Sequence, residues 1–180
     1  MSGKCRSAPV LETERLRLRQ FTKDDFSPYL AIVGDPDVMR HFGGVGMSAE
    51  ECWRRMAAST GQWPMIGIGG WAVERLSDGK LVGTLSLFNA WRDLQPDFGD
   101  TPEMGWIFAT EVHGQGIAGE ACRAVLGWAE RTLRPTPIWA IIAPANEPSL
   151  RLAERLGFEQ VGESVYHDEP TLVLQRPAWG

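Results

Sequence analysis

A segment containing three glycines, Gly114, Gly116 and Gly119, joins a strand expected over residues 103–109 to an amphipathic helix expected over 116–131. The first amides of a helix have no partner inside the helix, and the helix dipole is positive at that end, so this end attracts anions. Glycine also lets the backbone approach phosphate oxygens closely. The segment therefore predicts a strand–turn–helix unit that holds a phosphate or pyrophosphate group. A glycine-rich connection without a ligand is the alternative.

The same glycines match the pattern G-x-G-x-x-G that is typical of dinucleotide-binding domains. Such a domain places the motif after its first strand, with an acidic residue about 20 positions further on. Here the motif lies two-thirds along the chain, and the next strand ends at residues 141–145 (IIAPA) without an acid. No Gly-Lys-Ser/Thr sequence follows either, which excludes a P-loop. Nicotinamide and nucleoside-triphosphate chemistry are therefore disfavoured.

The rest of the chain alternates between strand and helix patterns. Alternating apolar residues, turn signals and short apolar runs predict strands. Capping residues such as Thr22 and the Ser48–Glu51 capping box predict helix starts. Strands are expected at residues 10–20, 68–75, 81–88, 103–109, 138–142, 158–166 and 171–175, and helices at 22–34, from 48 onward, 116–131 and 146–157. Without a repeat or a linker, residues 1–180 are expected to form one α/β (α+β) domain.

Composition limits the partners. The net charge of −5 disfavours a nucleic-acid partner, and no apolar run is long enough to span a membrane. Residues 1–9 lack the apolar core of a secretory signal, so a cytoplasmic protein is expected. Cys5, Cys52 and Cys122 are too few and too scattered for a disulfide framework or a zinc site, so no metal is expected. Cys122 falls on the core face of its helix.

Five motifs occur in a fixed order along the chain. They are Glu14–Arg19 (ERLRLR), Asp35–Met39 (DPDVM), His113–Ala118 (HGQGIA), Asn146–Ser149 (NEPS) and Glu154–Phe158 (ERLGF). Together they resemble the GNAT superfamily of N-acetyltransferases, and within it the ribosomal-protein-type (RimJ/RimL-like) branch. The resemblance covers roughly residues 10–176.

The resemblance implies a fold and an activity. The expected fold is a central mixed, mostly antiparallel, splayed sheet of about seven strands flanked by about four helices. The expected activity transfers an acetyl group from acetyl-coenzyme A to a primary amine, by direct attack in a ternary complex. The acceptor is a protein N-terminus or a small-molecule amine, and the protein is a monomer or a homodimer. Ala153 stands where many members have a tyrosine that protonates the leaving thiolate, so a coenzyme A-binding module without catalysis is the alternative.

The resemblance also assigns a coenzyme site. Its candidate residues are Phe108, Ala109, His113, Gly114, Gln115, Gly116, Ile117, Ala118, Gly119, Asn146 and Ser149. Arg151, from its place on the last helix, is a further candidate that would reach the ribose phosphate of the coenzyme, with a solvated helix face as the alternative. The glycine turn should hold the pyrophosphate, and the main chain of Phe108 and Ala109 should pair with the pantetheine arm. His113 replaces the usual Gln or Arg at the start of the turn. Asn146 should contact the arm from the opposite strand, with a plain helix cap as the alternative.

Three residues are candidates for proton transfer. A protonated amine needs a base, and Glu103 at the mouth of its strand is the first candidate, with a solvated strand-end charge as the alternative. Ser149 is the first candidate for the acid that protonates the thiolate, and Tyr166 is the second. Solvent is an alternative to both, because a thiol has a pKa near about 8.5.

The acceptor site is the least determined part of the sequence. Weaker candidates for the base are Asp97, Asp100 and Glu111. Trp63 and Trp91, together with the acids of residues 93–100, are expected to form an acidic, aromatic-lined pocket. Such a pocket suits a peptide N-terminus, a polyamine, an aminoglycoside or another small amine.

Overall fold

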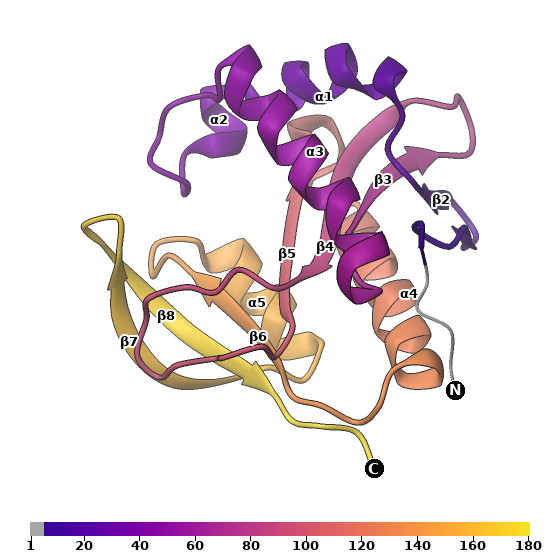
Figure 1. The fold of residues 1–180 in the computed structure, drawn as a ribbon. Helices are drawn as coiled ribbons and strands as arrows, with labels where there is room; N and C mark the ends of the chain where they lie inside the picture. The colour runs from indigo at the N-terminus through magenta and orange to yellow at the C-terminus, as the bar shows by residue number, and fades with distance from the viewer. Residues whose placement is uncertain (1–5) are drawn as a thin grey trace.

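The computed structural model describes residues 6–180 and contains one eight-stranded sheet with the strand order β1-β2-β3-β4-β5-β6-β8-β7 (Figure 1). The strands are β1 (Leu11–Glu12), β2 (Leu16–Arg19), β3 (Gly70–Arg75), β4 (Leu81–Phe88), β5 (Glu103–Phe108), β6 (Ile138–Ile142), β7 (Glu159–Tyr166) and β8 (Glu169–Arg176). The α-helices are α1 (Phe26–Val33), α2 (Pro36–Met39), α3 (Ala49–Ile66), α4 (Ile117–Thr132) and α5 (Glu147–Arg155). Neighbouring strands run antiparallel except β5 and β6. The mixed, mostly antiparallel sheet is therefore confirmed.

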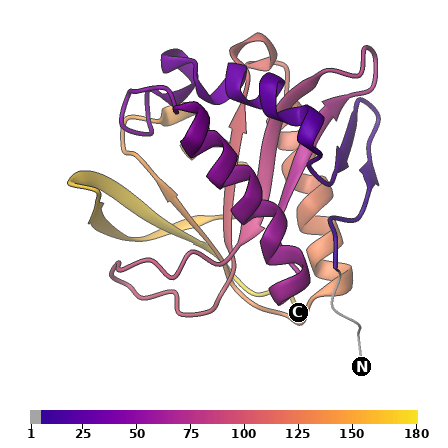
Figure 2. The same ribbon diagram turned by 45° about the horizontal axis from the view of Figure 1, so that its top comes forward.

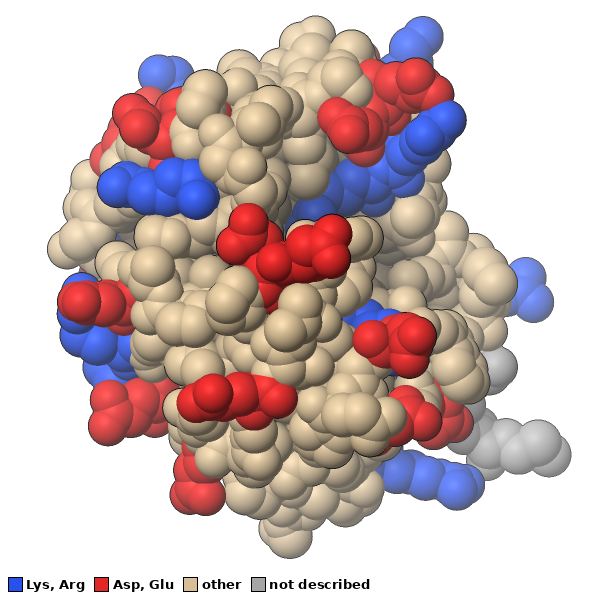
Figure 3. Space-filling model, turned by 90° about the vertical axis from the view of Figure 1, so that its left-hand side faces the viewer, with Lys and Arg blue, Asp and Glu red and all other residues tan. Residues whose placement is uncertain are grey.

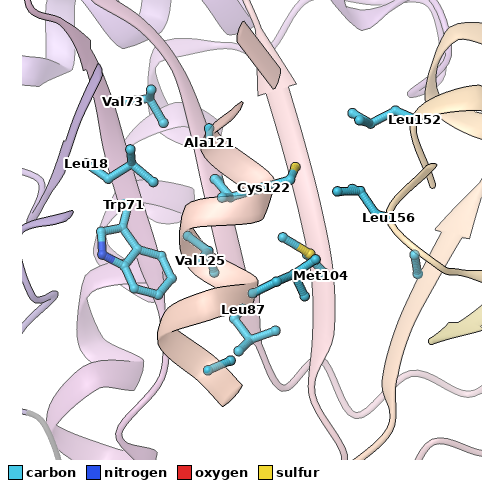
Figure 4. Close-up of a cluster of buried hydrophobic side chains, with 14 of the residues drawn as sticks. Leu18, Trp71, Val73, Leu87, Met104, Ala121, Cys122, Val125, Leu152 and Leu156 are labelled. Carbon is cyan, nitrogen blue, oxygen red and sulfur yellow. The ribbon is translucent and has the colours of Figure 1, made fainter. Parts of the chain in front are cut away.

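Helices cover the sheet on both faces, with α1 and α3 on one side and α4 on the other (Figures 1 and 2). Figure 4 shows the main core, in which Leu18, Val73, Leu87 and Met104 of the sheet face Cys122 of α4. Side chains alternate along a strand, so Ile107 of β5 instead packs in the second cluster with α1 and α3. The two faces of β5 therefore look into two different layers.

Local sequence accounts for where the elements begin. The capping box predicted at Ser48 is present, because its hydroxyl accepts from the Glu51 amide while Glu51 accepts from the Ser48 amide. Thr22 opens a short 3-10 turn that runs into α1. The expected strand 10–20 is divided into β1 and β2, and the Asp35–Pro36 motif adds the short helix α2. These divisions give eight strands and five α-helices instead of about seven and four.

The tryptophans differ from the expectation. Trp63 is fully buried and forms edge-to-face contacts with Trp71 and Trp128, at centroid distances of 4.6 and 5.6 Å. Its indole N–H donates to the Gly70 carbonyl. The interpretation of Trp63 as a pocket residue is therefore wrong, because the ring fills the core where α3, α4 and β3 meet.

The two described cysteines lie inside the protein. Cys122 packs in the main core, where burial raises the pKa of its thiol. Cys52 is buried against α1, and Cys5 lies outside the described residues. Within residues 6–180 no group of three His, Cys, Asp or Glu side chains is arranged to hold a metal ion. None of the helices in that range is long and apolar enough to cross a membrane.

The sheet opens between β5 and β6. These parallel strands pair only at Glu103 and Trp139, where the Trp139 amide donates to the Pro102 carbonyl at 2.9 Å. Beyond that point β5 keeps its partner β4 up to Phe108, but it has no partner residue on β6. The splayed sheet implied by the motifs is therefore confirmed, and its open end lies near the start of α4.

Candidate active site

The glycine turn presents an array of free amides. Gly114 and Gly116 have left-handed backbones, with φ of 73° and 76°, and Gly116 is the N-cap of α4. No group in residues 6–180 accepts a hydrogen bond from the amides of residues 114–119. A Cβ built on Gly114 would meet nothing within 4 Å. The turn therefore has the open N–H groups and the helix start that bind anions.

Arg15 braces this turn from the N-terminal part of the sheet. Its guanidinium donates to the Gln115 carbonyl at 2.9 Å and to the Glu120 carboxylate at 2.7 Å. Glu120 also accepts from the Thr13 hydroxyl at 2.6 Å. Burial alone would raise the pKa of Glu120, but the hydrogen bonds from Thr13 and Arg15 lower it below its ordinary value. Arg15 thus fixes the turn and adds positive charge beside it.

The main chain of Phe108 and Ala109 marks the open edge of β5. The Ala109 amide donates to the Val82 carbonyl of β4 at 2.9 Å. Main-chain groups alternate between the two sides of an antiparallel strand, so the groups of Phe108 face away from β4. The Phe108 carbonyl accepts from Nε2 of His113 at 3.0 Å. A carbonyl oxygen has two lone pairs, so this bond leaves it able to accept a second donor.

Ser149 sits where α5 faces the opening. Its amide donates to the Asn146 side chain at 3.3 Å, so the prediction that Asn146 caps this helix is confirmed. The indole N–H of Trp106, on β5, donates to the Ser149 hydroxyl oxygen at 3.2 Å. Indole is a donor only. The Ser149 hydroxyl must therefore accept from Trp106, and its own hydrogen is free to donate elsewhere.

Glu103 lies on the other face of β5. Side chains alternate along a strand, so Glu103 points to the same face as Ile107, four positions on. Trp106 points to the opposite face, together with Met104 and Phe108. Glu103 is only 3% exposed, so its interpretation as a solvated strand-end charge is wrong. Arg92 donates to both of its carboxylate oxygens, at 2.6 and 2.9 Å. The acid and base candidates, Ser149 and Glu103, thus lie on opposite faces of a strand whose edge is open.

Tyr166 approaches Glu103 through Arg92. The Arg92 guanidinium lies 4.5 Å from the centroid of the Tyr166 ring, at the tip of the β7–β8 hairpin. Burial alone would lower the pKa of Arg92, but the hydrogen-bonded Glu103 carboxylate raises it. Arg92 therefore stays charged between an acid and an aromatic ring. The residue spacing gave no sign of this contact, and Arg92 was not among the predicted site residues.

The remaining predicted residues lie further out. Arg151 is exposed and pairs with Glu147 one turn earlier on α5, at 3.0 Å. Glu111 pairs with Arg75 at 3.1 Å on the surface, and Asp97 accepts from the Gly99 amide within its own loop. Trp91 is 74% exposed. No hydrogen bond or ion pair found in residues 6–180 joins these side chains to Ser149, to Glu103 or to the glycine turn.

Acidic groups gather on the side from which the β7–β8 hairpin projects. Figure 3 shows acidic side chains across the middle of this face and most basic side chains nearer its margin. The loop 89–102 and the hairpin tip contribute exposed acids, namely Asp93, Asp97, Asp100, Asp168 and Glu169. Such a face favours a cationic molecule over an anionic one.

Comparison with known proteins gives three concordant findings. The family model described as "Acetyltransferase (GNAT) domain" matches residues 15–159. The Bacillus subtilis protein YoaA, named as an N-acetyltransferase, is 29% identical over 155 residues, which cover 86% of this chain and 85% of YoaA. YdaF from the same organism, whose name proposes a ribosomal N-acetyltransferase, is 30% identical over 135 residues, covering 71% of this chain and 67% of YdaF.

The fold has solved counterparts. A Bordetella pertussis protein, assigned by its description to the same family, superposes with a TM-score of 0.83 at 30% identity. The match covers 94% of this chain and 99% of that one. The family model spans the glycine turn, the open edge of β5 and the start of α5, which are the parts that make up the site. The chain belongs to the GNAT acetyltransferase family and is an acetyl-coenzyme A-dependent N-acetyltransferase.

Proposed function

We propose that this protein transfers the acetyl group of acetyl-coenzyme A to the free α-amino group of a polypeptide N-terminus. One observation carries the acyl-transfer part of the proposal: the free amides of the glycine turn lie at the end of β5 where the sheet is open. A ligand with a pyrophosphate and an extended amide-containing arm matches both features. The name of YdaF and the acidic face of Figure 3 favour a cationic, protein-derived acceptor.

The residues of the turn fit the coenzyme. Residues 114–119 would hold its pyrophosphate through main-chain N–H groups, with the charge of Arg15 nearby. The main-chain groups of Phe108, which face away from β4, would pair with the pantetheine arm, as an added strand pairs with a sheet edge. When bound, the coenzyme supplies an activated thioester. His113, which donates to the Phe108 carbonyl, must share that oxygen with the arm or turn away from it.

The proton on the leaving side would reach the thiolate through Ser149, whose hydroxyl regains a proton from solvent, which in turn takes up the proton that the attacking amine loses. The Trp106 indole occupies a lone pair of the hydroxyl oxygen, which leaves the Ser149 O–H directed elsewhere. Because a thiol has a pKa near about 8.5, a weak donor is enough. Ser149 can therefore serve in a chain that has Ala153 in place of the tyrosine. Asn146 fixes the Ser149 main chain through the helix cap.

The acceptor would approach from the other face of β5. A peptide α-amine has a pKa of about 7.7–8.0 and a lysine about 10.4, so much more of the α-amine is neutral near pH 7. Direct attack by a neutral α-amine needs little help from a strong base. This difference favours the N-terminus of a polypeptide over its lysine side chains.

The test is thiol release from acetyl-coenzyme A with a panel of acceptors. The panel contains a short peptide with a free N-terminus and an internal lysine, the same peptide with a blocked N-terminus, a polyamine and an aminoglycoside. We expect the free peptide to be the best acceptor and the blocked peptide to be inactive. Mass spectrometry then locates the added acetyl group. Preference for the polyamine or the aminoglycoside would contradict the polypeptide acceptor. Coenzyme binding without thiol release for any amine would favour the non-catalytic module.

A further inference from the structure

Arg92 joins the loop of residues 89–102 and the adjoining start of β5 to the β7–β8 hairpin, which lies far away in the chain. It lies in the loop of residues 89–102 and donates to both oxygens of Glu103 at the start of β5. Its guanidinium also contacts the ring of Tyr166 in the β7–β8 hairpin. The side chains are 16% exposed for Arg92 and 4% for Glu103, so the ion pair is largely shielded from water.

We propose that Arg92 is a positioning residue for the acceptor site. Through its pair with Glu103 and its contact with Tyr166, it holds the loop and the hairpin tip together at the acceptor face of β5. This inference rests on the proposed function and deepens it. The acceptor wall is defined here as residues 89–102 and 166–169. We infer that the charged contact of Arg92 holds the two parts of this wall together.

The loop has other anchors on both sides of Arg92, and Leu94, two positions further on, is buried in the cluster that contains Phe98 and Trp139. At its start, Asn89 exchanges two hydrogen bonds with the Gln62 side chain of α3, at 2.9 and 3.1 Å. In its second half, the Phe98 ring stacks on Trp139 of β6 at 4.4 Å. Arg92 lies between these anchors, next to the exposed Trp91. It is therefore the charged contact that holds the exposed part of the loop against Glu103 of β5.

The hairpin tip needs such a contact because its turn is demanding. His167 and Asp168 both have positive φ, of 52° and 63°, which side chains other than glycine adopt at a cost. The turn brings the His167 ring to 4.0 Å from Tyr166. The face of Tyr166 then attracts the guanidinium, because aromatic rings bind cations over their faces. The hairpin is thus joined to the loop by this charged contact, in addition to the packing of Tyr166 against the apolar cluster that contains Leu94 and Phe98.

This arrangement gives Glu103 a different role from that of a base. Both oxygens of its carboxylate accept hydrogen bonds from the Arg92 guanidinium, in an ion pair that is largely shielded from water. In this pair Glu103 acts on the acceptor by fixing Arg92. The pair also leaves no net charge at the base of the acceptor wall, so the exposed acids around it determine which amines approach.

The experiment compares Arg92→Gln, Arg92→Lys and Glu103→Gln with the unmodified enzyme, using one peptide acceptor. We expect Arg92→Gln to lower kcat/KM for the acceptor by about 10- to 100-fold, the effect of misplacing a substrate. Arg92→Lys should recover part of this loss. The Kd for coenzyme A, measured by calorimetry, should stay within about twofold of the unmodified value, since no contact with the glycine turn changes.

The matched control is Arg176→Gln. Arg176 sits at the opposite end of β8 from the hairpin tip and pairs with Glu130 at 2.6 Å, with a side chain that is 21% exposed. This variant also breaks an ion pair of β8, although its partner Glu130 is 38% exposed, and it should leave the KM for the acceptor unchanged. A loss equal to that of Arg92→Gln would mean that general destabilisation, and not positioning, explains the effect.

The pH profile separates positioning from base catalysis. If Glu103 positions Arg92, Glu103→Gln and Arg92→Gln should give similar losses that are the same at every pH. If Glu103 is the base, Glu103→Gln should lose most activity at low pH, while Arg92→Gln keeps the normal profile. The second result would overturn the proposal.

Hydrogen exchange does not depend on activity, so it tests this proposal separately from the acetylation assay. Hydrogen exchange in Arg92→Gln should become faster both in residues 89–102 and around the hairpin tip, because both lose the same contact. Faster exchange in the loop alone would contradict the joint wall, whether or not any amine is acetylated. Failure to find an acceptor, together with faster exchange in both segments, would count against the proposed function only.

Discussion

The hydrogen bond from Trp106 to Ser149 gives the candidate acid an unambiguous direction. A serine hydroxyl usually rotates to suit its surroundings, and its role cannot be read from its position alone. Here one neighbour can only donate, so the remaining hydrogen is available to a departing sulfur. Under the proposed function, two residues on different elements, Trp106 of β5 and Ser149 of α5, would share this role.

The two residues should differ in how much they matter. Ser149→Ala removes the donor and should lower kcat by roughly 10²-fold, the lower end of acid–base effects. Trp106→Phe removes one hydrogen bond worth about 1 kcal/mol and should lower kcat by about fivefold. Rapid-mixing measurements of thiol release, where chemistry limits the rate, check both values. Equal rates for Ser149→Ala and the unmodified enzyme would transfer the role to Tyr166 or to water.

The pair of Arg92 and Glu103 makes a prediction for stability. Removing one member of a buried ion pair leaves the other charge uncompensated, and Arg92→Gln should lower the free energy of unfolding by about 3 kcal/mol. The double variant with Glu103→Gln should be more stable than Arg92→Gln alone. Urea unfolding of the four proteins measures the difference. The four proteins are the unmodified protein, the two single variants and the double variant. If the double variant is the least stable of them, removing the Glu103 carboxylate does not relieve the cost of the charge that Arg92→Gln leaves uncompensated.

For single residues, the sequence predicts the roles that depend on local spacing. Asn146 and Ser149 are three positions apart, and the helix cap follows from that spacing. Trp106 and Ser149 are 43 positions apart, so no local pattern brings them together. Glu103 is recognisable as an acid at a strand end, but its burial depends on how the loop folds back over it.

Among the elements, the turn before α4 depends most on its backbone. Gly116→Val places a branched side chain where φ is 76°, beside the free amides. We expect the Kd for coenzyme A to rise well over tenfold, because the side chain obstructs an anion that must touch the main chain. Calorimetry with coenzyme A measures the change.

Gly79→Val serves as the control for this substitution. Gly79 lies in the β3–β4 turn, has a φ of 70° and also has open space around its Cα. Both variants carry similar backbone strain, of about 1–2 kcal/mol, but only one lies at the site. Equal coenzyme affinity in the two variants would count against the phosphate-binding turn.

The elements themselves follow from the sequence where their pattern is local. The glycine turn, the α4 face and the Ser48 capping box need only their own neighbours, and they appear as predicted. The expected strand at 10–20 is divided because the chain reverses at residues 13–15, where the Thr13 amide donates to the Leu16 carbonyl and β1 turns back to pair antiparallel with β2. The residues next to Trp63 in the sequence do not distinguish a pocket residue from a core residue. Its burial comes from Trp71 and Trp128, which lie on other elements.

The whole molecule should lose stability in acid through one buried carboxylate. Asp25 accepts from Arg19 at 2.8 and 2.9 Å and from the Thr22 amide at 2.7 Å. Burial alone would raise the pKa of Asp25, but these contacts lower it below its ordinary value. A depressed pKa contributes stability that is present above about pH 4 and is lost as the pH falls through the folded-state value.

Asp25→Asn tests this contribution. The variant should be less stable than the unmodified protein by about 2 kcal/mol at pH 7, the range of a hydrogen bond to a charged group. The difference should shrink as the pH falls below 4, because the native carboxylate becomes protonated. Thermal unfolding at several pH values measures it. A difference that is the same at pH 3 and pH 7 would mean that the charge of Asp25 contributes nothing.

The single residue pair between β5 and β6 has a consequence for the cohesion of the protein. Within the sheet, one residue pair, Glu103 and Trp139, links the strands β1 to β5 to the strands β6 to β8. A thioester ligand that lies along the open edge would add hydrogen bonds on the side of β6 to β8 and hold the two parts together. The substrate would then act as a temporary strand between the two parts of the sheet. The enzyme would be most rigid while the acyl donor is bound and most flexible just after the thiol is released.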